Sequence, residues 1–164
     1  MSESTAPAEE RVITTVAELK EMIGQEMGVS DWLEITQERV NLFADATGDH
    51  QFIHVDPERA KQTFFKGPIA HGYLTLSLLP YLSSTRKGGV KVNLGGRMGV
   101  NYGLNKVRFT APVPVGSRIR ARTTLLAVEE IGTQAIQITN QVVIEIEGQD
   151  RPACIAETLG RTYF

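Results

Sequence analysis

The sequence has 164 residues, a one-domain length that can bury an ordinary core without disulfide or metal staples. A formal net charge of −2 excludes the basic surface typical of nucleic-acid binding, and no apolar run approaches the roughly 20 residues of a membrane span. The one cysteine, Cys154, excludes an intramolecular disulfide and is predicted to be a small buried hydrophobe rather than a nucleophile.

The N-terminal region is predicted to contain a tail, a helix and a short strand. Residues 1–13 form a predicted flexible tail, which is polar and lacks the apolar core of a signal peptide, so we expect a cytoplasmic protein. The folded domain is then expected to span residues 14–164. Within it, apolar side chains at helical spacing predict a short amphipathic helix over residues 15–27, and residues 32–35 are expected to form a strand.

Two further helices are predicted from their N-terminal signals. Thr36 is a suitable N-cap for a helix over residues 37–46, whose apolar side chains share one face. A short helix is expected to begin at Asp56-Pro57, because aspartate at the cap and proline in the first turn are typical of helix N-termini. The segment between the two helices, residues 47–57, is predicted to be irregular.

The rest of the chain predicts one apolar helix and a sheet to cover it. Residues 69–82 are apolar on nearly every side, so other elements must wrap the helix that they form, and Pro80 is expected to kink or end it. From Val90 onward, apolar and polar residues alternate, which predicts antiparallel strands with one covered face. The predicted fold class is therefore α+β, a single domain in which a curved antiparallel sheet wraps a long central helix.

The residues that indicate chemistry lie in the irregular segment. Asp49 and His54 are close in sequence, and a carboxylate with an imidazole can move a proton near neutral pH. Other roles stay open on the residues alone, because Asp49 also suits a turn and His54 also suits a hydrogen-bonded place in the core. Asp56 suits a helix cap, and His50 suits a solvent-exposed position.

A metal site is a second chemical interpretation of the same region. The side chains that could act as ligands are Asp49, His50, His54, Asp56 and His71. Three or four of them would have to converge on the ion. His50 and His54 lie outside any predicted helix, so their spacing of four residues does not place them on a common face. We therefore predict no bound metal.

Two separated motifs resemble the MaoC-like family, which comprises the (R)-specific enoyl-CoA hydratases and related dehydratases. The family signature is close to G-D-x-N-P-x-H, and an H-G pair that opens a long apolar helix follows it about 17 residues later. The residues that match this pattern in register are Gly48, Asp49, His54, His71 and Gly72. The order of the elements also agrees over most of the chain.

The sequence departs from the family pattern at one place. Gln51-Phe52 replaces the Asn-Pro of the signature, so the amide is one methylene longer and the loop has lost its proline. A nodulation-protein-N-like branch of the family is similar in carrying this glutamine. We expect Gln51 to hold the catalytic water or the acid–base pair, and Phe52 to contribute bulk in place of rigidity.

The resemblance implies a hot-dog fold, a homodimer, no cofactor, and a CoA or acyl-carrier-protein thioester as substrate. The implied reaction adds water to a trans-2-enoyl thioester to give a 3-hydroxyacyl thioester, or removes it in reverse. Asp49 and His54 would bind the water and exchange protons with it. The N–H of Gly72, at the predicted helix N-terminus, would bind the enolate oxygen as an oxyanion hole.

Substrate contacts and alternative functions complete the prediction. The predicted substrate-binding residues are Phe52, Tyr73 and Leu76 along the acyl chain, and Lys106 and Arg108 near the CoA phosphates. A hot-dog acyl-CoA thioesterase would share the scaffold but place a carboxylate near the central helix, and residues 69–82 contain none. A non-catalytic acyl-binding or dimer-partner subunit would lack the Asp–His pair, which is intact here.

Overall fold

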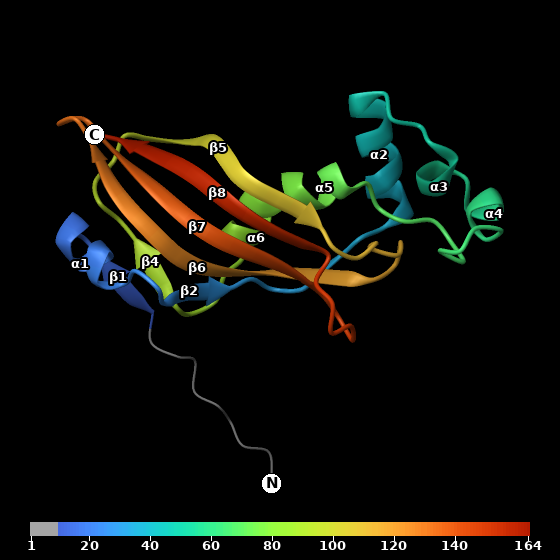
Figure 1. The fold of residues 1–164 in the computed structure, drawn as a ribbon, viewed down its shortest axis with the longest axis horizontal. Helices are drawn as coiled ribbons and strands as arrows, with labels where there is room; N and C mark the ends of the chain where they lie inside the picture. The colour runs from blue at the N-terminus through green and yellow to red at the C-terminus, as the bar shows by residue number, and fades with distance from the viewer. Residues whose placement is uncertain (1–9) are drawn as a thin grey trace, which may run out of the picture.

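The fold is built on one curved antiparallel sheet (Figure 1). The computed structural model describes residues 10–164. Five strands follow the order β2-β6-β7-β8-β5, and a further strand, β3, also pairs with β6. Their bounds are β2 (Glu26–Val29), β3 (Leu33–Glu34), β5 (Met98–Phe109), β6 (Arg118–Ile131), β7 (Ala135–Ile146) and β8 (Cys154–Tyr163). Buried residues alternate along much of β6 and β7, which confirms the predicted strands with one covered face.

A helix in two parts crosses the covered face of this sheet (Figure 1). The two parts, α5 (Gly72–Ser77) and α6 (Leu79–Ser84), contribute buried leucines to a core shared with β6, β7 and β8. Cys154 belongs to that core, is completely buried, and has its thiol pKa raised to about 11 by burial. The α+β class and the central helix against a curved sheet are thus confirmed, and Cys154 is the small buried hydrophobe that was predicted.

The central helix differs from the prediction in its start and in its continuity. It begins at Gly72 rather than at residue 69, because Ile69 forms an isolated β-bridge that keeps this part of the chain extended. It breaks at Leu78, where Pro80 in the first turn of α6 has no N–H to donate to the preceding turn. Tyr73 is 70% exposed, so within one chain the sheet wraps only one side of the helix.

The N-terminal helix is shorter than predicted, and a strand follows it. Helix α1 (Val16–Glu21) ends before Gly24, whose φ of +86° is a left-handed conformation that favours glycine. Met27 was predicted to be helical, but it lies in β2 and is buried. Pairing with β6 supplies hydrogen bonds from a distant part of the sequence, which the local helical spacing does not reveal.

The end of the predicted tail forms a strand. Strand β1 (Arg11–Ile13) pairs in parallel with β4 (Val90–Val92), and Ile13 is buried in a second core cluster with α1. The folded part therefore reaches at least to Arg11, earlier than the predicted boundary at residue 14. The remainder of the predicted tail, residues 1–9, lies outside the described residues.

The predicted helix caps before the site are confirmed. Thr36 accepts a backbone N–H at the start of α2 (Gln37–Thr47), and Asp56 does the same at the start of α4 (Pro57–Ala60). Both helices lie beyond one end of the sheet (Figure 1). Within residues 10–164, no helix has the length and apolar character needed to cross a membrane.

The segment between these two helices was predicted to be irregular, but part of it is helical. Phe52–Val55 form the one-turn helix α3. The N–H of Ile69 donates to the carbonyl of Ile53 at 3.0 Å, so the turn is held from a distant part of the chain. This contact overrides the low helix propensity of the two β-branched residues in the turn.

Candidate active site

Asp49 emerges from a sharp helix end. Gly48 terminates α2 in a left-handed conformation, with φ of +78°, and its N–H donates to the carbonyl of Ala44. The carboxylate of Asp49 then accepts the backbone N–H of Gln51 at 3.3 Å, which is an Asx-turn contact. Asp49 therefore has the turn role that its sequence position allows, while its exposed side chain keeps further acceptor sites for a ligand.

His54 is buried and bound in a way that determines its tautomer. It lies in α3, and only 7% of its surface is exposed. Its Nδ1 lies 2.7 Å from the backbone carbonyl of Ile69, and a carbonyl oxygen only accepts, so Nδ1 must carry the donated hydrogen. Nε2 is then the ring nitrogen with a free lone pair. The amide of Gln37 fixes the backbone next to it by donating to the His54 carbonyl at 2.7 Å.

Burial lowers the pKa of His54 below its usual value. Desolvation of the charged imidazolium is the main cause, and the nearby His71 ring lowers the pKa further. The Ile69 carbonyl and the Asp49 carboxylate act in the opposite direction but do not reverse the shift. The uncharged form of His54, which is able to accept a proton, is therefore favoured at neutral pH.

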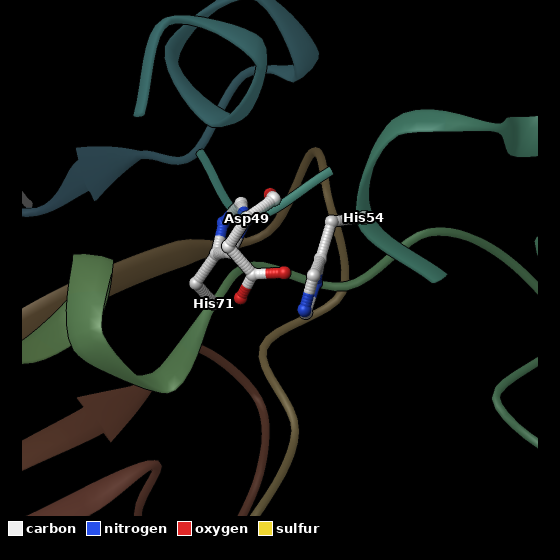
Figure 2. A group of neighbouring side chains, drawn as sticks. All are labelled: Asp49, His54 and His71. Carbon is white, nitrogen blue, oxygen red and sulfur yellow. The ribbon is translucent and has the colours of Figure 1, made fainter. Parts of the chain in front are cut away.

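His71 completes a cluster of three ionisable side chains (Figure 2). It immediately precedes α5 and is 2% exposed. Its Nε2 lies 2.9 Å from the backbone carbonyl of Asp49, and its ring stacks on His54 with the centroids 3.9 Å apart and the planes at 26°. One ligand-type atom from each of Asp49, His54 and His71 lies within 4.8 Å of the others.

The stacked rings do not suit a shared metal ion. A metal bound to imidazole lies close to the ring plane, about 2.0–2.1 Å from the nitrogen. Planes inclined at 26° and stacked at 3.9 Å meet much farther away than that. The geometry therefore favours acid–base chemistry over metal binding at this cluster.

A pocket of about 310 Å³ opens beside His54 and Gly72. Its other walls are mostly apolar and include Phe65, Thr75 and Phe109. A Cβ atom on Gly72 would lie 2.9 Å from the Phe109 ring, so only glycine allows the present contact at this wall. The predicted proton-transfer residue, His54, and the predicted oxyanion donor, Gly72, therefore line the same pocket. The apolar residues of its wall could contact an acyl chain.

The other predicted site residues lie outside the wall of this pocket. Gln51 is exposed, and it bonds to Asp49 through its backbone N–H rather than through its side-chain amide. Leu76 lines a second cavity of about 660 Å³ between α5–α6 and the sheet. The remaining residues are Phe52, whose ring lies 4.3 Å from the Arg59 guanidinium carbon, Tyr73 beside Phe109, and Lys106 and Arg108, exposed on β5. Their substrate-binding roles stay predictions.

Three contributors to the site were not predicted. The Ile69 carbonyl sets the His54 tautomer, Gln37 holds the backbone of His54, and Phe109 covers Gly72 from β5. A backbone carbonyl gives no sequence signal, and Gln37 resembles any polar residue in the first turn of a helix. Phe109 is the last residue of an alternating strand, so its position on the pocket wall depends on sheet register.

Known proteins resemble this chain in both sequence and fold. Residues 18–146 match the family described as MaoC like domain. The 3-hydroxyacyl-thioester dehydratase Z of Mycobacterium tuberculosis is 54% identical over 151 residues, which cover 92% of this chain and 97% of that protein. Nodulation protein N of Rhizobium leguminosarum bv. viciae is 47% identical over 143 residues, which cover 87% of each. The solved (R)-hydratase from A. caviae, involved in PHA biosynthesis, has a TM-score of 0.63 at 25% identity, covering 84% of this chain and 94% of that one.

Proposed function

The chain belongs to the MaoC-like domain family, and on that premise we propose that it is a hydro-lyase acting on acyl thioesters. The names of its relatives, a 3-hydroxyacyl-thioester dehydratase and an (R)-hydratase, support this class of enzyme. The resemblance stated from the two motifs is thereby confirmed, as is the hot-dog fold. The proposed reaction is the (R)-specific hydration of a trans-2-enoyl-CoA to the 3-hydroxyacyl-CoA, or the reverse dehydration.

One observation carries the assignment of the acid–base pair. The Ile69 carbonyl accepts a hydrogen bond from Nδ1–H of His54, so the basic Nε2 is the nitrogen left for a ligand in the pocket. Asp49 lies beside the His54 ring, with a carboxylate that has further acceptor sites. A water between the two could donate one hydrogen to each, which is the arrangement that general base catalysis needs.

In the proposed mechanism, each group has a role in the addition of water to the enoyl thioester. The pair removes a proton from water as the oxygen bonds to C3 of the enoyl thioester. The electrons of the double bond move toward the thioester carbonyl. Its oxygen gains negative charge and accepts a hydrogen bond from the N–H of Gly72. The pair then returns a proton to C2. Asp49 and His54 lie close together, so both proton transfers are assigned to the pair.

A direct assay tests the proposed function. Purified protein is incubated with crotonyl-CoA and with longer trans-2-enoyl-CoAs, and the ultraviolet absorbance of the enoyl thioester is followed. We expect the absorbance to fall and a 3-hydroxyacyl-CoA to form without release of free CoA. Absorbance that stays constant with every chain length would contradict hydration, and release of free thiol would instead support a thioesterase.

The pH dependence of hydration tests the state of His54. Its pKa is lowered from the usual 6.5 by burial, so the proton-accepting form persists to a lower pH than it would for an exposed histidine. We therefore expect kcat/KM to fall on the acid side with a midpoint below 6.5, as His54 becomes protonated. An acid limb centred above 6.5 would contradict a desolvated His54 as the base.

We further propose that two copies of the chain pair through β5. This strand lies at one edge of the sheet, and eleven of its twelve residues are exposed, including apolar Val100, Tyr102 and Leu104. A long exposed edge strand of this kind is normally paired or covered. Phe109 of the same strand reaches the pocket, so pairing there would border the site.

A charge placed on β5 tests this pairing. Leu104 is 46% exposed, and Ile23, which follows α1, is exposed to the same degree at 45%, which makes it a matched control. We expect the wild-type protein and Ile23→Asp to have the mass of a dimer by light scattering, and Leu104→Asp to have the monomer mass of 18.0 kDa. A Leu104→Asp protein that stays dimeric would place the interface elsewhere.

A further inference from the structure

We propose that His71 is a positioning residue that holds Asp49 and His54 in their working arrangement. This inference rests on the proposed hydration reaction and adds a third member to its machinery. His71 contacts both members of the pair at once, through a hydrogen bond to the Asp49 backbone and a stacked ring on His54. It is a positioning residue because neither of these contacts involves the substrate.

The hydrogen bond determines which nitrogen of His71 carries hydrogen. The partner of Nε2 is the backbone carbonyl of Asp49, which can only accept, so Nε2 must donate. Asp49 lies just beyond the left-handed Gly48, where the chain has left α2. The His71 bond therefore ties the backbone of an exposed loop residue to the buried segment that precedes α5.

The other nitrogen shows that packing alone does not account for a histidine here. Nδ1 of His71 is buried and has no hydrogen-bond partner among the described residues. An unpaired buried polar atom lowers stability, and a phenylalanine of similar shape would avoid that loss. The ring also packs against Phe43, with the centroids 5.0 Å apart, in an otherwise apolar contact. The Nε2 bond to Asp49 is the feature that a phenylalanine could not provide.

The stacked ring limits how His54 can move. His54 is fixed at Nδ1 by Ile69, so the motion left to its ring is rotation about that hydrogen bond. His71 covers one face of the His54 ring at a centroid distance of 3.9 Å and so restricts this rotation. A displacement of about 1 Å in a reacting group can cost on the order of 100-fold in rate, so such a restraint has a measurable effect.

The first test needs no enzyme activity. The chain has three histidines, so the ring ¹⁵N signals of the ¹⁵N-labelled wild-type protein can be assigned individually by NMR. We expect His71 near neutral pH to show a protonated Nε2 and an unprotonated Nδ1, and His54 to show the opposite tautomer. A His71 ring with hydrogen on Nδ1 would overturn the proposal, whether or not the protein hydrates enoyl-CoA.

The second test separates the hydrogen bond from the packing. Glutamine can place an amide N–H near the position of His Nε2, whereas the shorter asparagine cannot reach it, and both remove the ring. We expect His71→Asn, which loses both contacts, to lower kcat by on the order of 10- to 100-fold with a much smaller change in KM, and His71→Gln, which keeps the hydrogen bond, to recover part of the loss. His71→Phe, which keeps the stack without the donor, should lose less than His71→Asn.

The outcomes distinguish this proposal from the one on which it rests. Wild-type protein that hydrates no enoyl-CoA contradicts the proposed function, while the NMR result on the tautomer still stands. If the wild type is active and the Gln and Asn variants lose kcat equally, the Nε2 bond to Asp49 does not position the pair and the proposal fails. Thermal unfolding of each variant identifies loss of folding, and the Gln–Asn comparison remains decisive if His71→Phe does not fold.

Discussion

Replacement of Asp49 by Asn, or of His54 by Gln, is expected to lower kcat for enoyl-CoA hydration by on the order of 10²- to 10⁴-fold. Asparagine keeps the size of the side chain but cannot accept a proton, and glutamine keeps a polar group without a basic nitrogen. Burial and the Ile69 bond leave only Nε2 of His54 for proton transfer. The rates are measured from the loss of enoyl absorbance, with thermal unfolding recorded for each variant.

A second Asp–His pair in the same region supplies the matched control. His50 and Asp45 are exposed, and Nε2 of His50 lies 2.8 Å from Oδ1 of Asp45. Neither residue belongs to the cluster of Asp49, His54 and His71. We expect Asp45→Asn and His50→Gln to hydrate substrate at the wild-type rate. Wild-type turnover in Asp49→Asn or His54→Gln would remove that residue from the proposed mechanism.

Replacement of Gly72 by Ala keeps the backbone N–H but is expected to lower kcat/KM by on the order of 10²-fold, as much as losing one oxyanion donor, because the added methyl group hinders its use. The added Cβ would lie 2.9 Å from the ring of Phe109, so either the ring or the backbone must shift. In the proposed complex, the methyl group would also lie where the thioester oxygen approaches the N–H of Gly72. The loss is measured with crotonyl-CoA, because its short acyl chain makes few other contacts.

The double variant Gly72→Ala/Phe109→Ala separates the two causes of this loss. Removing the Phe109 ring relieves the 2.9 Å contact but leaves the methyl group at the proposed oxyanion site. We expect the double variant to be as thermally stable as Phe109→Ala alone. Its kcat/KM should stay below that of Phe109→Ala. If the double variant recovers the activity of Phe109→Ala, Gly72 is needed only for packing against β5.

The positions of the site residues along the chain could be predicted because they form local patterns. Asp49, His54 and Gly72 lie in two short motifs, and the structure brings His54 and Gly72 onto one pocket wall with Asp49 beside them. What makes His54 a base is not local. The Ile69 carbonyl belongs to a segment 15 residues away, and its hydrogen bond depends on the tertiary fold. The roles of all these residues in catalysis stay predictions until the variants are measured.

The fold was predictable where one periodicity dominates. Alternating residues predicted β6 and β7, and cap residues such as Thr36 and Asp56 predicted two helix starts. The predictions were wrong where distant pairing competes with local spacing, as at Met27 in β2 and at the start of the central helix. No local pattern distinguishes a strand that is covered by its own chain from one, like β5, that is left exposed.

The complete burial of Cys154 has a practical consequence for distinguishing hydration from thioester hydrolysis. Its thiol is inaccessible in the core, and burial raises its pKa to about 11, so very little reactive thiolate exists at neutral pH. It is also the only cysteine in the sequence. A chromogenic disulfide reagent added to the folded enzyme and an acyl-CoA will therefore report CoA released by cleavage, free of background colour from the protein. The same reagent should react with the protein itself only after unfolding, so its slow colour change would measure the opening of the core between the helix and the sheet.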